Sequence, residues 1–161
     1  MLAAFCVGFG LSIPGLVLWL VSRMADGLDG LLARATNRTS ALGGYLDITL
    51  DMAAYSVMIL GFAAAHSGEG LVWSAILVGY VLCITTTLAL SAALEGLDRV
   101  HAGDRSYRFT PGLAEAGETS LSYALFVLFP QWIGPLAWIW CAATWLTGVQ
   151  RTVLAVRLLR P

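Results

Sequence analysis

Long apolar stretches alternate with short polar ones along the chain, and this pattern predicts a series of membrane-spanning helices. A spanning helix needs about 20 apolar residues. Five stretches come near this length, at roughly residues 3–25, 44–65, 71–94, 118–132 and 134–156. The fourth is short and ends at Pro130, and a turn at residues 131–135 leads into the fifth, so we expect these two to form a helical hairpin. Pro14 and Gly15 fall inside the first stretch, where neighbouring helices can cover the carbonyl that a kink frees.

Composition strengthens the prediction of a membrane protein. Hydrophobic residues make up 58% of the chain, mean hydropathy is +0.79, and charged residues reach only 12%, against roughly 25% in an average soluble domain. Open sheets would leave unpaired backbone groups in lipid. We therefore predict an all-α, polytopic transmembrane helix bundle that forms a single domain over residues 1–161. The net charge of −1 and the lack of a basic tract give no indication of a nucleic-acid partner.

The basic residues predict the orientation of the bundle. The chain has no lysine, and the loops and helix ends that carry its nine arginines all fall on one side of the predicted topology. By the positive-inside rule this side is cytoplasmic. Five spans with a cytoplasmic C-terminus would place Met1 outside, with nothing to anchor the first span. We therefore expect that a first transmembrane helix precedes this sequence.

Four aspartates stand at fixed intervals in residues 26–51, where the first predicted span leaves the membrane and the second enters it. Asp26 and Asp29 are three residues apart and Asp47 and Asp51 are four apart, so each pair projects from one helix face. Carboxylates are hard oxygen ligands that suit Mg²⁺ or Mn²⁺. Four of them so close together would repel one another unless cations neutralise them. The spacing therefore predicts a two-metal site at the cytoplasmic interface, able to hold a diphosphate.

The same segment carries a family resemblance. The pattern Asp26-x-x-Asp29-Gly30-x-x-Ala33-Arg34, eight residues, then Gly43-x-x-x-Asp47-x-x-x-Asp51 resembles the complete signature of the CDP-alcohol phosphotransferase family of integral membrane enzymes. Members usually have six transmembrane helices and often pair as homodimers. The resemblance implies transfer of a phosphatidyl or related phosphoalcohol group from a CDP-linked lipid, such as CDP-diacylglycerol, to a small alcohol with release of CMP.

The resemblance also implies a role for each motif residue. Asp26 and Asp47 would each bridge two Mg²⁺ or Mn²⁺ ions, with Asp29 completing one site and Asp51 the other. Asp51 matches the catalytic base. The residues that match contacts to the cytidine diphosphate are Gly30, Arg34 and Ser40. Ser40 could equally cap the following helix, and Arg38 could be a plain positive-inside anchor.

Other readings of the segment remain open. Intramembrane prenyltransferases also hold a lipid diphosphate through aspartate-rich motifs, although theirs lie on helices far apart in the chain. A cation carrier or channel could use an acidic cluster, and a shortened chain could be an inactive fragment. For the acceptor, Glu115 and Glu118 before the fourth span favour a neutral or cationic alcohol over a phosphorylated one, although the nearby Arg105 and Arg108 weaken this inference.

Overall fold

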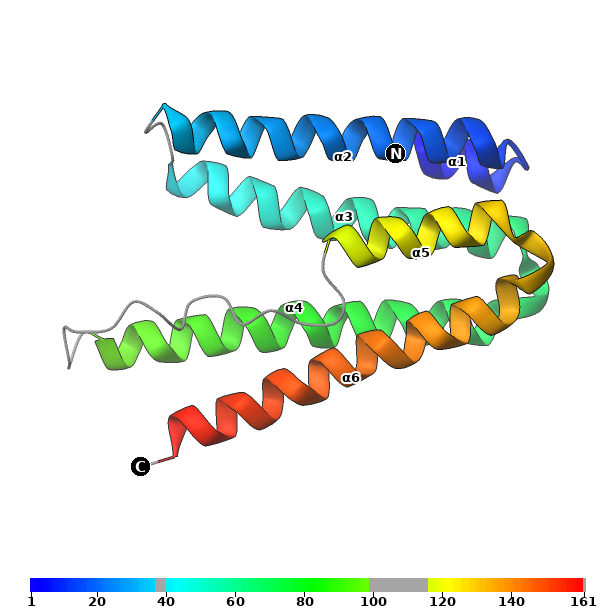
Figure 1. Ribbon diagram of the computed structural model, residues 1–161. Coiled ribbons are helices and arrows are strands. Elements are labelled where there is room, and N and C mark those ends of the chain that lie inside the picture. The colour runs from blue at the N-terminus through cyan, green and yellow to red at the C-terminus, as the bar shows by residue number, and fades with distance from the viewer. Residues whose placement is uncertain (37–39, 99–115, 161) are drawn as a thin grey trace.

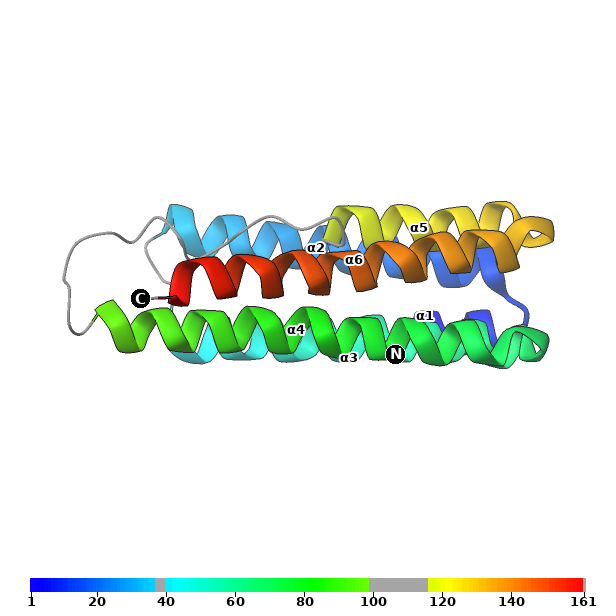
Figure 2. The same ribbon diagram turned by 90° about the horizontal axis from the view of Figure 1, so that it is seen from below.

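The computed structural model describes residues 1–36, 40–98 and 116–160, with the backbone alone for residues 30, 33, 34, 41, 95–98 and 116. Within this part of the chain every regular element is helical, and the predicted all-α bundle is confirmed. Four long helices run along the molecule (Figure 1): α2 (Ser12–Ala35), α3 (Ala41–Ala65), α4 (Gly70–Asp98) and α6 (Ile133–Leu159). Figure 2 shows them in two layers, with α3 and α4 in one and α2 and α6 in the other.

Two short helices, α1 (Leu2–Gly8) and α5 (Ala116–Leu128), lie toward one end of the bundle. At that end the 3₁₀ turns η1 (Ser67–Glu69) and η2 (Pro130–Trp132) reverse the chain. Between α5 and α6 the chain turns by 107°, so the predicted hairpin is more open than an antiparallel pair. The C-terminal ends of α2, α4 and α6 therefore gather at the opposite end of the bundle (Figure 1).

The first predicted span is wrong, because the chain breaks it into two helices. In place of one helix over residues 3–25, α1 ends at Gly8 and α2 starts at Ser12. Gly10 in the turn has φ of +81°, a left-handed conformation that glycine adopts without steric cost. Pro14 then lies in the first turn of α2, where proline is tolerated, and it does not kink a span.

The helix α1 packs closely against α2 and α3 through glycines. A methyl group at Gly15 would lie 2.7 Å from Val7 Cγ2, and one at Gly61 would lie 2.5 Å from the carbonyl oxygen of Ala4. Small residues of this kind let the backbones of membrane helices approach each other. Val7 on α1 is fully buried as a result. The short helix is thus a packed part of the bundle, and it holds the N-terminal half of α2 in place.

An aromatic core joins α3, α4 and α5. Phe62 stacks on Trp73 with ring centroids 5.8 Å apart, and it meets Phe126 edge to face at 5.3 Å. All three rings are buried. Such pairs stabilise a fold by about 0.5–1.5 kcal/mol beyond the area they bury. The core fixes the C-terminal part of α3, the helix that carries Asp47 and Asp51.

Two helical stretches in the described residues are long and apolar enough to cross a membrane, Leu42–Ala65 and Ser67–Leu94. The bent pair Gly117–Leu128 and Pro130–Leu159 makes a third if it counts as one span. The helix α2 has 24 residues, but Arg23, Asp26 and Asp29 make its C-terminal half less apolar. The second and third predicted spans thus meet this criterion, and the fourth and fifth meet it only when taken together as one bent span. The protein is an integral membrane protein, and its exposed large apolar side chains on these helices suit contact with lipid.

Candidate active site

The helix α3 begins at a well-formed cap. Ser40 has extended backbone, with φ of −134° and ψ of 154°, and its side-chain oxygen accepts a hydrogen bond from the Gly43 amide at 3.0 Å. This bond satisfies one of the amide groups that have no partner at a helix start. The cap sets where α3 begins, and the helical repeat then places Asp47 and Asp51 on one face.

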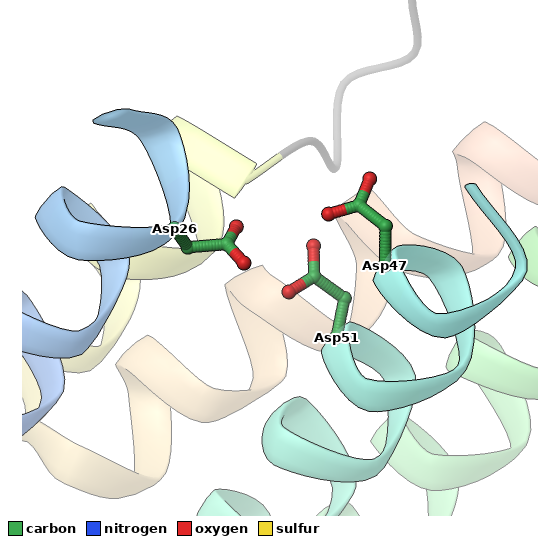
Figure 3. A group of neighbouring side chains, drawn as sticks. All are labelled: Asp26, Asp47 and Asp51. Carbon is green, nitrogen blue, oxygen red and sulfur yellow. The ribbon is translucent and has the colours of Figure 1, made fainter. Parts of the chain in front are cut away.

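Three of the four motif aspartates come together (Figure 3). Asp26 projects from α2, while Asp47 and Asp51 project from α3, one turn apart, and the three carboxylates point toward one another. One oxygen from each lies within 4.8 Å of the others. The side chain of Asp26 is 41% exposed and that of Asp51 is 24% exposed. The site is therefore open to a ligand, but it is shielded enough for the three charges to repel one another.

The fourth aspartate, Asp29, lies one turn further along α2. It is exposed, and it is not one of the three aspartates that approach each other. Its role as a ligand remains a prediction. Gly30 and Arg34 follow it on α2, where the structure gives only their backbone. Residues 37–39, with Arg38, and residues 99–115, with Arg105, Arg108 and Glu115, lie outside the described part of the chain.

Arg23 lies among the carboxylates, although the sequence pattern indicated only a positive-inside anchor. Its guanidinium forms an ion pair with Asp51, and its Nη1 lies 3.7 Å from Asp26 Oδ2. Only 16% of the side chain is exposed. Arg23 precedes Asp26 by three residues on α2, so both side chains lie on one helix face. This spacing was the signal in the sequence that could have identified it.

Aromatic side chains form a floor beneath the carboxylates. The guanidinium carbon of Arg23 lies 5.1 Å from the ring centroid of Trp19 and 5.7 Å from that of Tyr55, both within the range of a cation–π contact. The Tyr55 hydroxyl also donates a long hydrogen bond of 3.5 Å to Asp51 Oδ2. Trp19 donates to Ser120 Oγ at 3.2 Å, and this bond links α2 to α5.

A buried hydrogen-bond network continues this floor into the bundle. The Tyr123 hydroxyl donates to the Tyr55 carbonyl at 3.0 Å and lies 2.8 Å from the Tyr80 hydroxyl, which accepts a bond of 2.9 Å from Trp140 Nε1. Buried polar groups that are satisfied in this way make a core rigid. The network ties α3 to α4, α5 and α6 one turn beyond Asp51, so the site rests on a fixed base. Nothing in the sequence pattern indicated it.

The site has the chemistry of a divalent-cation site. Its three donors are hard oxygen atoms from two helices, the ligand type that Mg²⁺ and Mn²⁺ favour. The guanidinium that lies against Asp26 and Asp51 shows that the group attracts a cation. The residues present therefore fit a divalent ion, which Asp26, Asp47 and Asp51 could hold.

Known protein families and relatives give evidence that is independent of this geometry. The sequence matches the family model described as CDP-alcohol phosphatidyltransferase over residues 1–150. It is 36% identical over 148 residues to an inner membrane protein of Escherichia coli, YnjF, a match that covers 90% of this chain and 71% of that protein.

Two further relatives carry the name of an activity. The chain is 28% identical over 150 residues to the archaetidylinositol phosphate synthase of Methanothermobacter thermautotrophicus, with 89% of this chain and 70% of that protein covered. It is 30% identical over 145 residues to the phosphatidylinositol phosphate synthase of Streptomyces avermitilis, with 83% and 57% covered. No solved structure matches the chain.

Proposed function

Because the chain belongs to the CDP-alcohol phosphatidyltransferase family, we propose that it transfers a phosphatidyl or related phosphoalcohol group from a CDP-linked lipid to an alcohol, with release of CMP. The observation that carries the proposal is the meeting of Asp26, Asp47 and Asp51 at one point between α2 and α3. A diphosphate needs concentrated positive charge, and three carboxylates can hold the cations that supply it. The rings of Trp19 and Tyr55 lie next to Arg23 on the side of the buried core.

The proposed roles follow the donor chemistry. Asp26, Asp29, Asp47 and Asp51 would hold two Mg²⁺ or Mn²⁺ ions, which when bound supply charge neutralisation for the diphosphate and orient it. Asp51 would accept the proton of the acceptor hydroxyl as the hydroxyl oxygen bonds to phosphorus and the bond from phosphorus to CMP breaks. Gly30, Arg34 and Ser40 would contact the cytidine diphosphate.

The names of two relatives narrow the choice of acceptor alcohol. Two of them are named as synthases of inositol phosphate lipids, which favours a phosphorylated acceptor over the neutral or cationic alcohol that Glu115 and Glu118 indicated. We therefore propose an inositol phosphate as the first acceptor to try, with a neutral polyol, glycerol phosphate and an amino alcohol beside it.

We also propose that the site faces the cytoplasm. The described arginines lie on α2, in the C-terminal half of α6 and, for Arg160, directly after α6. The C-terminal ends of α2 and α6 share one end of the bundle (Figure 1). The positive-inside rule makes this end cytoplasmic. The aspartates lie toward the same end of the bundle, in the C-terminal half of α2 and the N-terminal half of α3.

We further propose that the protein pairs with a second copy of itself, as related enzymes do. The mass of the purified protein in detergent tests this part of the proposal.

The test is release of CMP by the purified protein in detergent or nanodiscs, with CDP-diacylglycerol and each acceptor in turn. We expect CMP release to need an acceptor, to stop when a chelator is added, and to return with Mg²⁺ or Mn²⁺. Activity that a chelator leaves unchanged would exclude the two-metal mechanism. Two further assays test the alternatives. Turnover of a prenyl diphosphate without turnover of the CDP-lipid would support a prenyltransferase, and cation flux in liposomes without such turnover would support a carrier or channel.

A further inference from the structure

Arg23 is a positive charge built into the group of carboxylates that would bind the divalent ions. It pairs with Asp51 and lies 3.7 Å from Asp26, two of the three aspartates that converge. A carboxylate oxygen that accepts a hydrogen bond from a guanidinium is less available to a metal ion, and the guanidinium also repels that ion. Arg23 and a divalent cation therefore compete for Asp51.

We propose that Arg23 is a tethered counter-ion that takes the place of one divalent cation at Asp51 and leaves that carboxylate when the ion binds. This inference rests on the proposed function. It assigns Arg23 as a positioning residue, because it acts on the reaction through Asp51. It also implies that wild-type affinity for divalent ions is set below the value that the carboxylates alone would give.

The surroundings of Arg23 show how the side chain can leave Asp51 and remain in the site. Its guanidinium carbon lies over the rings of Trp19 and Tyr55, which attract a cation without any carboxylate. Its buried Nε has no hydrogen-bond partner among the described residues. Besides its ion pairs, the guanidinium donates a long hydrogen bond of 3.4 Å from Nη2 to the exposed Ser22 Oγ, which holds the side chain only weakly in its present position. An arginine that only stabilised the fold would be expected to have its buried donors paired.

The test compares wild type with Arg23→Gln by titration of the purified protein with Mn²⁺, followed by electron paramagnetic resonance of the free ion. Glutamine keeps the chain length and a polar end but removes the charge. We expect Arg23→Gln to bind Mn²⁺ about fivefold more tightly, the change that loss of a partly exposed ion pair near 1 kcal/mol produces. Arg23→Lys, which keeps the charge without the fork of donors, should stay near wild type.

Thermal unfolding gives an independent readout. In chelator, Arg23→Gln should unfold at a lower temperature than wild type, because Asp26 and Asp51 lose the cation that pairs with them. Mn²⁺ should raise the unfolding midpoint of Arg23→Gln by more than it raises that of wild type. A purely structural role predicts an equal loss with and without Mn²⁺. Arg157→Gln is the matched control, since Arg157 is exposed in the last turn of α6.

The outcomes separate this inference from the proposed function. If wild type binds no Mn²⁺, both fail. If wild type binds Mn²⁺ and Arg23→Gln binds it equally or more weakly, the counter-ion role is overturned and the proposed function stands. Tighter binding by Arg157→Gln, equal to that of Arg23→Gln, would also overturn the inference, because the effect would then come from net charge alone.

Discussion

At the scale of single residues, the site depends on a few oxygen atoms brought together from two helices. Asp51 is the residue with most contacts among them. It faces Asp26 and Asp47, pairs with Arg23 and accepts a long hydrogen bond from Tyr55. A residue in this position can act both as ligand and as base, and the two roles can be separated by a change that keeps the oxygen but removes the basicity.

We expect Asp51→Asn to lower CMP release by at least about 100-fold, the usual contribution of a positioned general base. The amide oxygen can still face a cation, so Mn²⁺ and nucleotide binding should be largely kept. Thr49→Ala is the control, because Thr49 lies two residues away on α3 and bonds only the backbone of its own helix. Near-normal CMP release by Asp51→Asn would remove Asp51 from the role of base.

The three converging aspartates were predicted from the sequence, whereas Arg23 was missed. The intervals of three and four residues place each aspartate on a helix face whatever the rest of the fold. Arg23 has the same interval to Asp26, but the positive-inside rule already explained an arginine at that point. The network of Tyr55, Tyr80 and Tyr123 was also missed, because its members lie on three helices and their spacing in sequence carries no information about contact.

At the scale of helices, the start of α3 controls how Asp47 and Asp51 are presented. Ser40 caps the helix through its bond to the Gly43 amide, and a methyl group on Gly43 would lie 3.1 Å from Ser40 Oγ. The capping role that the sequence left open is thus observed. The proposed contact of Ser40 with the nucleotide is a second role, and experiments can distinguish it from the capping role.

We expect Ser40→Ala to lower the stability of the protein by about 1 kcal/mol through loss of the cap. Thermal unfolding measures this loss, and Ser40→Asn should restore most of it because asparagine caps equally well. The KM for the CDP-linked lipid tests whether Ser40 also contacts the nucleotide. A raised KM in Ser40→Ala that Ser40→Asn repairs would assign the effect to the helix start, whereas a raised KM in both variants would support a nucleotide contact.

The positions of the long helices could largely be predicted, but the break between α1 and α2 could not. Residues 3–25 are mostly apolar, with Ser12, Ser22 and Arg23 as exceptions, so hydropathy indicates one continuous span. The break depends on Gly10, which adopts a positive φ, and on the close approach of α1 at Gly15 and Gly61. A glycine in an apolar run is equally compatible with a straight helix, so only the packing of α1 against its neighbours decides whether the helix breaks there.

At the scale of the whole molecule, the bundle has one end rich in arginine and one that carries the turns η1 and η2. The same division places the carboxylates in the half of the bundle where α2 ends and α3 begins. A CDP-linked lipid has its apolar chains in the membrane and its nucleotide in water. A site at the edge of the bundle can reach both parts.

The orientation can be measured with single cysteines in a background where Cys6, Cys83 and Cys141 are replaced by alanine. Ser67→Cys lies on the exposed turn η1, and Leu159→Cys lies at the end of α6. In right-side-out vesicles an impermeant maleimide should label the first directly and the second only after the membrane is opened. Labelling in the reverse order would place the site outside, and CMP release by the background protein checks that it is folded.

The stacking of Arg23 on Trp19 has an optical consequence. We expect a guanidinium 5.1 Å from the centre of an indole ring to shift the fluorescence emission of that ring through its electric field. Any event that draws Arg23 toward or away from Asp51 changes this field. Trp19 is thus an intrinsic reporter at the carboxylates, and replacing it with phenylalanine identifies its share of the signal. The fluorescence of Trp19 can then report the binding of a cation at the carboxylates in the unlabelled protein and in real time.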